Sequence, residues 1–380
     1  MGQPSAFQPD SERRRSWAEV DLGALQRNLR WLRDRAPGRR AIAVVKANAY
    51  GHGATRVAQS LLAAGAEMLA VATAAEAAEL RAQRIESPLL ILEGLDAPEG
   101  ADRIVADRLT PVVARLDQLA PLEAAADRSG RVLPVHLKFD TGMHRLGFDW
   151  RQAGELLERV AASAALRIDG LMSHLACADE LDSAQTARQR ERFAAVLAVA
   201  RERGVEPPWI HIDNSAGVIH GPTAATTAIR PGLALYGADP TLERATRLEP
   251  AMALRTRVVG AVDLPAGSHV GYGGAFVTTR KTRVLTLPLG YADGLPRAAG
   301  GHAELGLAGR RVPVVGRVSM DLSAVDAGDA SETAVGDEVL VFGRSNGFEL
   351  RVEDLAQACG TLAYEIFVRI GPRVPRLYPS

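Results

Sequence analysis

Between about residues 40 and 240, short apolar runs alternate with longer stretches in which Ala, Leu, Arg and Glu recur at helical spacing. Strands that alternate with helices of this length form parallel sheets, because each helix carries the chain back across a face of the sheet. Eight such repeats predict a (β/α)8 barrel of the TIM type. The expected strands are residues 42–46, 68–71, 89–92, 111–113, 133–139, 168–173, 210–212 and 228–235, and helices are expected at residues 74–84, 151–162 and 184–203.

A doubly wound parallel sheet is the alternative architecture for this pattern. The chain has no G-x-G-x-x-G motif after its first predicted strand and no G-K-[ST] phosphate loop. Because these motifs accompany the nucleotide sites of doubly wound sheets, their absence favours the barrel.

The composition changes after Leu248-Glu-Pro250, where Val, Gly, Thr and Pro become frequent and long Ala-rich stretches vanish. Asn346-Gly347 between two apolar runs indicates a β-hairpin. We therefore predict a disordered tail at residues 1–16, a barrel at residues 17–245 and a mostly-β domain at residues 246–380. The expected strands of the last domain are residues 256–263, 284–289, 312–315, 322–325, 338–342 and 349–352.

Charge and composition exclude several classes of partner. The chain of 380 residues has 45 Lys+Arg and 45 Asp+Glu, with no domain-scale basic stripe, which argues against nucleic acid as a partner. It has no uninterrupted apolar run of membrane length, and its start lacks the basic segment and apolar core of a secretory signal, so we expect a cytoplasmic protein. Its two cysteines are expected to be reduced, and no histidine has metal-ligand spacing, so no metal is expected.

Lys46 ends an apolar run and is followed by a loop with Gly51 and Gly53. The carboxyl end of a barrel strand is where active-site residues lie. A lysine rooted in an apolar strand is partly desolvated, which lowers its pKa and frees the amine to attack a carbonyl. The alternative is a lysine at a strand end whose ammonium group reaches water.

The same design recurs after later strands. Lys138 and Arg145 flank a glycine-containing loop, where the alternative is an internal Lys–Asp pair with a surface arginine. His174 follows the sixth predicted strand. Asn214 and Ser215 come before small residues that can begin a helix, where a serine acts either as an N-cap or as an anion ligand.

The eighth strand is followed by Arg230-Pro231-Gly232-Leu233, at a place where barrels often bind phosphate. In the β domain, Tyr272 lies in a glycine-rich loop, and Met320-Asp321 and Tyr364-Glu365 are weak signals on their own.

Taken together, these segments resemble alanine racemase, in order from about residue 17 to residue 377. The most specific block runs from Val45 through Lys46 and Tyr50 to Gly53. Two local departures are His144, where many relatives have glycine, and the extended N-terminal tail. The resemblance implies a cytoplasmic bacterial homodimer that depends on pyridoxal 5'-phosphate (PLP) and interconverts L- and D-alanine to supply D-alanine for peptidoglycan.

The same resemblance implies two catalytic bases on opposite faces of the substrate. Lys46 holds the cofactor covalently and then serves as one base, while Tyr272 from the partner subunit serves as the other. Arg230 faces the pyridine nitrogen, and His174 links Arg230 to Tyr272. The cofactor-binding set implied by the resemblance is Lys46, Tyr50, His174, Asn214, Ser215, Arg230, Gly232, Leu233 and Tyr364.

Further roles follow from the same resemblance. Arg145, Met320 and Asp321 are expected to bind substrate, with Arg145 also near the phenolic oxygen of the cofactor. Lys138 corresponds to a lysine that is carbamylated in some members.

Three alternatives within PLP-binding proteins stay open at this point. A decarboxylase of basic amino acids usually has an acidic partner at the pyridine nitrogen, where this chain has Arg230. A PLP-binding homeostasis protein is usually a barrel alone. A racemase of broader substrate range differs only in pocket dimensions, which sequence does not specify.

Overall fold

The chain forms two compact units, which divide between Asp21 and Leu22 and between Glu249 and Pro250. We call Leu22–Glu249 the barrel unit and the remainder the β unit. The structure, a computed structural model, describes residues 15–241, 247–329 and 332–379. Most of the tail predicted to be disordered, residues 1–16, lies outside the described residues, but its last residue, Ser16, begins the strand Ser16–Val20.

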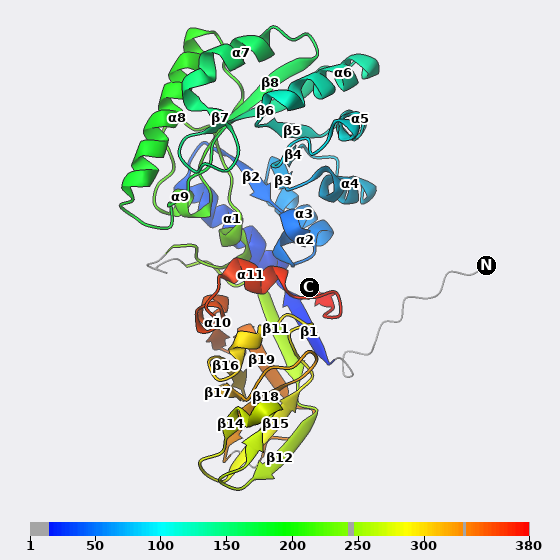
Figure 1. Cartoon of the computed structure of the whole chain (residues 1–380), viewed down its shortest axis with the longest axis vertical. Helices are drawn as coiled ribbons and strands as arrows, with labels where there is room; N and C mark the ends of the chain where they lie inside the picture. Colours follow the sequence, from blue (N-terminus) through cyan, green and yellow to red (C-terminus); the bar gives the residue numbers. More distant parts are fainter. Residues whose placement is uncertain (1–14, 242–246, 330–331, 380) are drawn as a thin grey trace, which may run out of the picture. The chain divides into compact units, whose positions relative to one another are not determined.

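The barrel unit contains eight parallel strands in the order β10-β2-β3-β4-β5-β6-β8-β9. Figure 1 labels β2 to β6 and β8 among them. The gap between β9 and β10 is narrowed by a backbone hydrogen bond from Thr227 to Ile210, 2.9 Å long, so the barrel is nearly closed. The predicted barrel is therefore confirmed, and the doubly wound alternative is wrong. The strands are β2 (Arg40–Val44), β3 (Met68–Val71), β4 (Leu89–Ile91), β5 (Thr110–Val113), β6 (Leu133–Asp140), β8 (Leu166–Met172), β9 (Trp209–His211) and β10 (Ala228–Ile229), with β7 (Phe148–Asp149) beside β6.

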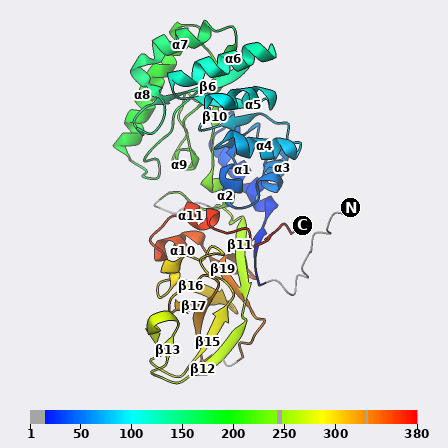
Figure 2. The ribbon, with the colours of Figure 1, turned by 45° about the vertical axis from the view of Figure 1, so that its right-hand side comes forward.

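Helices cover the outside of these strands, as two views of the ribbon show (Figures 1 and 2). α7 shows why they pack there, because its buried residues Ala153, Leu156, Leu157 and Val160 recur at helical spacing and form one apolar face. The helices of the barrel unit are α1 (Leu22–Arg35), α2 (Lys46–Tyr50), α3 (Ala54–Ala63), α4 (Ala74–Ala82), α5 (Ala101–Ala106), α6 (Leu119–Ser129), α7 (Ala153–Ala161), α8 (Ala184–Glu202) and α9 (Ser215–Ile219).

The last barrel strand is shorter than predicted. β10 ends at Ile229, whereas the apolar run suggested a strand to residue 235. Pro231 lacks the N–H that a strand would need, and Gly232 adopts φ −123° and ψ −95°, outside the strand region. The apolar residues that follow form a buried 3-10 turn, Leu233–Tyr236.

The β unit is built on a ten-stranded sheet with the order β12-β15-β18-β17-β16-β19-β11-β1-β21, and β20 pairs with β19. Its other strands, β13 and β14, form a separate two-stranded ribbon. The elements are β1 (Ser16–Val20), β11 (Met252–Arg257), β12 (Gly260–Leu264), β13 (His269–Val270), β14 (Phe276–Val277), β15 (Thr282–Leu287), β16 (Glu304–Leu307), β17 (Arg310–Val315), β18 (Ser323–Gly328), β19 (Glu338–Ser345), β20 (Phe348–Leu350), β21 (Arg376–Leu377), α10 (Val352–Ala358) and α11 (Ala363–Val368).

The barrel does not begin at Trp17 as predicted. β1 pairs antiparallel with β11 along its whole length, from Ser16 opposite Thr256 to Val20 opposite Met252. A hydrogen bond of 2.9 Å from the Ser16 hydroxyl to that of Thr256 adds to this pairing. The segment therefore belongs to the β unit, because its partner strand is more than 200 residues away in sequence and local pattern gives no sign of it.

Two further predictions concern the β unit. The predicted strand 256–263 is interrupted at residues 258–259, between β11 and β12. The hairpin at Asn346-Gly347 is confirmed, because both residues have positive φ, 48° and 81°, and they join β19 to β20 with Ser345 opposite Phe348. Such a two-residue turn follows the right-handed twist of its strands.

Candidate functional site

The residues predicted for the barrel site meet at the carboxyl ends of the strands. Lys46 lies two residues beyond β2, His174 two residues beyond β8, and Arg230 directly after β10. Lys138 lies in β6, two residues before the strand ends at Asp140, and Arg145 lies in the loop that follows the strand. Parallel strands bring these ends to one edge of the barrel, so residues almost 200 positions apart lie in one electrostatic environment.

The amine of Lys46 is tuned by this environment. Burial lowers its pKa below the ordinary value, and the neighbouring Arg145 lowers the pKa further, while Glu93 and Glu76 act in the opposite direction. A lysine with a lowered pKa has a larger neutral fraction near neutral pH, and the neutral amine is the nucleophilic form.

Lys46 is followed by a left-handed turn. Four consecutive non-glycine residues have φ between 51° and 53°, namely Ala47, Asn48, Ala49 and Tyr50. L-residues normally adopt this conformation singly, because each costs roughly 1–2 kcal/mol relative to a right-handed turn. The sequence prediction placed Lys46 at the end of a strand and missed this turn, for which the Ala-Asn-Ala-Tyr sequence gives little signal.

Several contacts hold the turn in place. The two carboxylate oxygens of Glu76 accept hydrogen bonds from the backbone N–H groups of Ala47 and Ala72, each 2.7 Å long. The side chain of Asn48 accepts the N–H of Ala54 at 2.8 Å, which joins the turn to the start of α3. The ring of Tyr50 packs on the buried ring of Tyr236, with centroids 4.7 Å apart. Such contacts can support strained backbone at a functional site.

The predicted phosphate loop is a set of backbone donors around one hydroxyl. The hydroxyl of Ser215 accepts hydrogen bonds from the N–H groups of Gly232 at 2.9 Å and Ala234 at 3.2 Å. Asn214 is the N-cap of α9, because its side chain accepts the N–H of Gly217 at 3.0 Å. Since a hydroxyl can donate while accepting, Ser215 keeps its own proton for an anionic ligand.

Arg230 is almost fully buried, with 3% of its surface exposed. Its guanidinium donates hydrogen bonds to the carbonyl of Ser173 at 2.9 Å, to Nδ1 of His174 at 2.9 Å and to Nδ1 of His211. Burial lowers the pKa of Arg230 to about 10, and Asp213 acts in the opposite direction. The group therefore remains a cation at neutral pH.

Lys138 is buried beside Arg230 and Arg145. Burial lowers the pKa of Lys138 to about 8, and the two arginines contribute to the shift. The sequence also allowed an internal pair between Lys138 and Asp140. In the structure the carboxylate of Asp140 instead accepts hydrogen bonds from the backbone N–H groups of Gly142, Met143 and His144. These bonds shape the loop that carries the exposed Arg145.

His144 departs from the glycine expected of the family and still adopts φ 56°. Its ring nitrogen Nδ1 lies 3.0 Å from the carboxylate of Asp140. That contact offsets part of the cost of left-handed backbone for a residue with a side chain.

The site thus gathers four basic side chains, Lys46, Lys138, Arg145 and Arg230, and both arginines lower the pKa of each lysine. This donor set fits a phosphorylated aromatic aldehyde. Lys46 has the amine that such a carbonyl requires, and the cations and backbone donors favour its phosphate and phenolic oxygen.

The remaining predicted residues lie in the β unit. Tyr272 is 72% exposed in the 3-10 turn Tyr272–Gly274, Met320 is 54% exposed, and Tyr364 of α11 is 40% exposed. The carboxylate of Asp321 accepts a hydrogen bond of 2.8 Å from Arg373, which also pairs with Asp293 at 3.0 Å. These predicted side chains are exposed at the surface of the unit.

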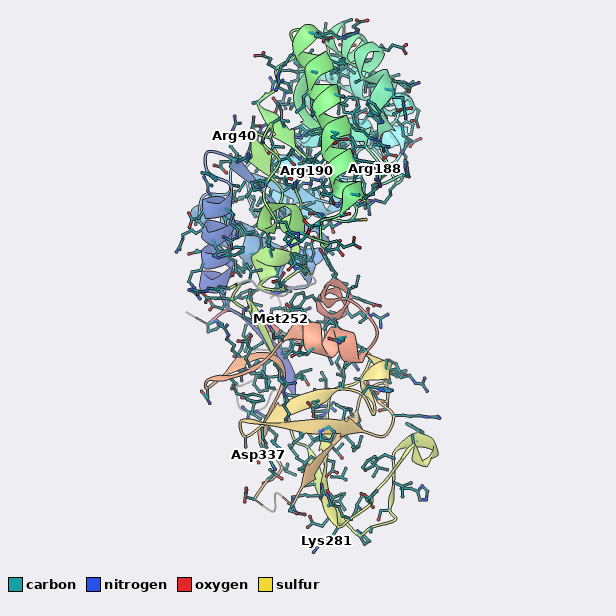
Figure 3. All side chains as sticks on the ribbon, turned by 90° about the vertical axis from the view of Figure 1, so that its left-hand side faces the viewer. Arg40, Arg188, Arg190, Met252, Lys281 and Asp337 are labelled. Atoms are coloured by element: carbon teal, nitrogen blue, oxygen red, sulfur yellow. The ribbon has the colours of Figure 1, made fainter. Side chains whose placement is uncertain are left out.

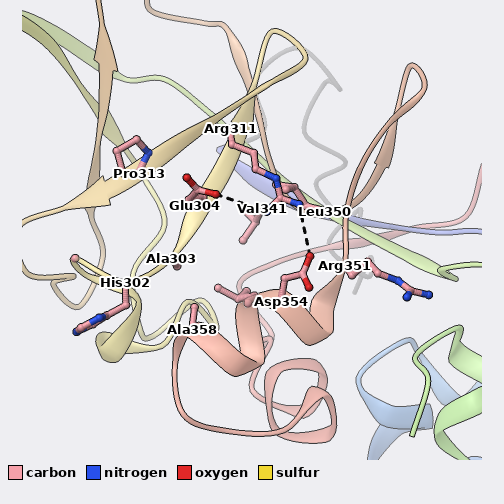
Figure 4. Close-up of a pocket in the computed structure, with 12 residues that line it drawn as sticks. His302, Ala303, Glu304, Arg311, Pro313, Val341, Leu350, Arg351, Asp354 and Ala358 are labelled. Atoms are coloured by element: carbon pink, nitrogen blue, oxygen red, sulfur yellow. Dashed lines mark ion pairs between the residues drawn. The ribbon is translucent and has the colours of Figure 1, made fainter. Parts of the chain in front are cut away.

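The β unit also contains a cavity of about 310 Å³ that none of the predicted site residues lines. Arg311 lies on its wall, 3.6 Å from Glu304 and 3.5 Å from Asp354 (Figure 4). Because Arg311 is paired with two carboxylates of the same wall, this cavity differs from the cationic mouth of the barrel.

Within the described ranges, no cluster of three or more His, Cys, Asp or Glu side chains has the arrangement of a metal site. In the same ranges, no helix is both long enough and apolar enough to cross a membrane.

Two residues of the site were missed as functional candidates. His136, in the middle of β6, and His211, the last residue of β9, are both fully buried. Their rings contact each other, and His211 also contacts Arg230. The sequence offered one signal, because His136 and Lys138 alternate along one strand and must face the same side.

The fold and the site define a barrel enzyme built around a reactive amine. Residues 20–240 match the alanine racemase N-terminal domain family, and residues 251–378 match the alanine racemase C-terminal domain family. The alanine racemase of Syntrophobacter fumaroxidans is 39% identical over 359 residues, which cover 94% of this chain and 95% of that protein.

Solved structures agree with these matches. An alanine racemase from D-cycloserine-producing Streptomyces lavendulae has a TM-score of 0.92 and 40% identity, covering 96% of this chain and 97% of that one. An alanine racemase from Bartonella henselae with covalently bound pyridoxal phosphate has a TM-score of 0.88 and 28% identity, covering 96% and 100%. The chain therefore belongs to the alanine racemase family and is an amino-acid racemase.

Proposed function

We propose that the chain binds PLP at the barrel mouth and interconverts L- and D-alanine by a two-base mechanism. The observation that carries this proposal is the partly desolvated amine of Lys46, held on a strained turn beside Arg145 and a buried Arg230. The bound cofactor supplies an electron sink for the pair left on the α-carbon when its proton is removed.

Lys46 holds the cofactor and then moves a proton at one face of the α-carbon. Racemisation requires a second base on the opposite face, and we assign this role to Tyr272 of a second copy of the chain. The exposure of Tyr272 on the β unit supports this assignment, because a phenol that is 72% exposed is accessible to another molecule. A homodimer with shared sites follows from the same assignment.

The phosphate is assigned to Tyr50, Ser215, Tyr364 and the backbone of Gly232 and Leu233. The tightness of the loop supports this role, because an added Cβ on Gly232 would lie 2.5 Å from the phenolic oxygen of Tyr50. Asn214 contributes by capping α9.

Arg230 is assigned to the pyridine nitrogen. A guanidinium keeps its proton at neutral pH, so the ring nitrogen beside it stays unprotonated. This weakens the electron sink and disfavours side reactions such as transamination. His174, whose Nδ1 accepts a hydrogen bond from Arg230, is assigned to link it to Tyr272.

Arg145, the backbone of Met320 and Asp321 are assigned to the substrate carboxylate and its surroundings, with Arg145 also beside the phenolic oxygen of the cofactor. The lowered pKa of Lys138, about 8 because of burial, supports its carbamylation. The neutral amine attacks carbon dioxide, an N–C bond forms and a proton is released, which replaces a cation by an anion beside Arg145.

We place this activity in the cytoplasm, where D-alanine supplies peptidoglycan synthesis.

The decisive experiment uses the low lysine content of the chain. It has only three lysines, at positions 46, 138 and 281, and Lys281 lies between β14 and β15 (Figure 3). Borohydride reduction of PLP-loaded protein followed by peptide mass spectrometry should place the cofactor on Lys46. Cofactor on Lys138 or Lys281 would contradict the assignment.

Activity is tested by incubating the loaded enzyme with L-alanine in D2O. D-Alanine with deuterium at the α-carbon is expected. Lys46→Ala should lose this activity and Lys281→Ala should keep it. Bound cofactor without α-proton exchange, or carbon dioxide release from lysine or ornithine, would overturn the racemase proposal. Initial rates with alanine, serine, lysine and arginine define the substrate range.

A further inference from the structure

Three histidines form a hydrogen-bonded group around Arg230. The guanidinium contacts Nδ1 of His174 and Nδ1 of His211, and Nε2 of His211 lies 2.9 Å from Nδ1 of His136. His136 and His211 have no exposed surface. Burial lowers the pKa of all three imidazoles, to about 3 for His136, and Arg230 contributes to each shift. At neutral pH the three rings are therefore uncharged, and each carries its proton on one of two nitrogens.

The guanidinium decides which nitrogen is protonated. Every N–H of an arginine is a donor and none of its atoms accepts, so a nitrogen that contacts it must present a lone pair. Nδ1 of His174 and Nδ1 of His211 are therefore unprotonated, and each of these rings carries its proton on Nε2. The N–H at Nε2 of His211 then points at Nδ1 of His136, which must be the acceptor.

The chain of donors ends at His136. With Nδ1 as acceptor, the proton of this ring lies on Nε2, which is buried and has no hydrogen-bond partner among the described residues. The ring packs against Gly170, where an added Cβ would lie 2.6 Å from it, so the backbone of β8 holds the ring in place. The opposite arrangement, in which His136 donates to His211, would leave an N–H of His211 facing the N–H of Arg230.

Other groups near Arg230 do not change this assignment of protons to the ring nitrogens. The carboxylate of Asp213, the nearest acidic influence on Arg230, is occupied by the backbone N–H and the hydroxyl of Thr223 at 3.0 and 2.7 Å. The guanidinium also donates to the carbonyls of Ser173 and Ile212, at 2.9 and 3.4 Å. A carbonyl oxygen only accepts, so neither contact alters the protonation of the imidazoles.

We propose that His136 is a positioning residue for Arg230: by accepting the N–H of His211, it fixes His211 in the tautomer whose Nδ1 receives the guanidinium. This inference rests on the proposed function only for its effect on catalysis, through the place of Arg230 at the pyridine nitrogen. The protonation pattern itself follows from the geometry of the barrel interior.

The direct test is neutron diffraction from crystals of the perdeuterated holoenzyme at neutral pD. Deuterium is expected on Nε2 of His174, His211 and His136 and absent from Nδ1 of each ring. Deuterium on Nδ1 of His211, or on both nitrogens of that ring, would overturn the proposal. Because this measurement does not depend on turnover, it separates a failure of the tautomer pattern from a failure of the racemase assignment.

Two variants test the link to catalysis. In His136→Asn, the amide oxygen is bonded to Cγ as Nδ1 is in histidine, so it can accept the N–H of His211. His136→Leu has similar bulk and no acceptor. We expect His136→Leu to lower kcat about tenfold with little change in KM, as for loss of a partner behind a site residue, and His136→Asn to recover most of the loss.

The comparison between the two variants is decisive. Equal losses in His136→Asn and His136→Leu would indicate that the ring only fills space, and an unchanged kcat in His136→Leu would show that His211 needs no acceptor. Either result overturns the proposal. His302→Leu, at an exposed histidine of the β unit, is the control and should leave kcat unchanged.

Discussion

Gly232 leaves room for the phenolic oxygen of Tyr50, which would lie 2.5 Å from a Cβ atom on that residue. Gly232 has φ −123° and ψ −95°, outside the regions that alanine normally adopts, so Gly232→Ala combines this steric clash with backbone strain. Gly232→Ala should displace the Tyr50 hydroxyl and weaken PLP binding by about tenfold, roughly the value of one hydrogen bond to a charged group. Fluorescence titration of the apoenzyme with PLP measures this change.

Gly100→Ala is a matched control in the same unit. Gly100 has φ −77°, and its nearest neighbour to an added Cβ is a flexible leucine side chain at 3.4 Å. Its PLP affinity should equal that of the wild type. A normal affinity in Gly232→Ala would show that Tyr50 does not need its present position to bind phosphate.

Lys138→Met should stabilise the unmodified protein near pH 7. Burial lowers the pKa of Lys138 from 10.5 to about 8, so the folded protein binds fewer protons than the unfolded chain between these values. The stability of the wild type therefore rises with pH across this window, and below pH 8 the charged lysine destabilises the fold by about 3 kcal/mol. Urea unfolding at several pH values should show the advantage of methionine below pH 8 and its decline towards pH 10.5.

Bicarbonate supplies the second arm of that experiment. If Lys138 is carbamylated, the advantage of Lys138→Met should shrink when bicarbonate is added, because the modified lysine pairs with the nearby arginines. Lys281→Met, at an exposed lysine, should show neither effect. An identical pH dependence in wild type and Lys138→Met would refute the buried, titrating amine.

Arg230→Gln should raise the pKa values of His174 and His211. Burial is the main cause of their low pKa values, and the positive charge of Arg230 is the second, so the values should rise without reaching that of an exposed histidine. NMR titration of histidine-labelled protein measures the change, with the exposed His302 as an internal reference. Unchanged His174 and His211 signals would mean that Arg230 does not act on these rings.

Glu76→Gln should loosen the left-handed turn that follows Lys46. The carboxylate accepts two backbone N–H groups with its two oxygens, and an amide has only one oxygen. One N–H loses its acceptor, at a cost of about 1–3 kcal/mol in the free energy of unfolding. The rate of hydrogen exchange at the backbone N–H groups of Ala47 and Ala72 should increase as well. Glu79→Gln, an exposed position of the same helix, should change neither quantity.

Much of the barrel could be predicted because strand and helix periods are local properties. The runs containing Met68 and Leu89, and the helices at Ala74, Ala153 and Ala184, lie where the pattern indicated them. The β-domain hairpin at Asn346 was predictable for the same reason, since its turn chemistry is contained in two residues.

What could not be predicted depends on distant partners or on unusual backbone. The pairing of Ser16 with Thr256 joins segments 240 residues apart, and no local signal reports it. The left-handed conformation at Ala47 depends on an acceptor from Glu76, on another helix. The hydrogen bonds of His136 arise only when β6 and β9 are assembled in the barrel.

The turn at residues 47–50 has a consequence for chemical protein synthesis. Its backbone is the mirror image of an ordinary helical turn, so a D-residue there would occupy its preferred conformation. Replacing Ala47 or Ala49 with D-alanine by peptide ligation would keep the methyl group and reverse the conformational preference. A member of a family named for making D-alanine would then gain stability from that amino acid within its own polypeptide.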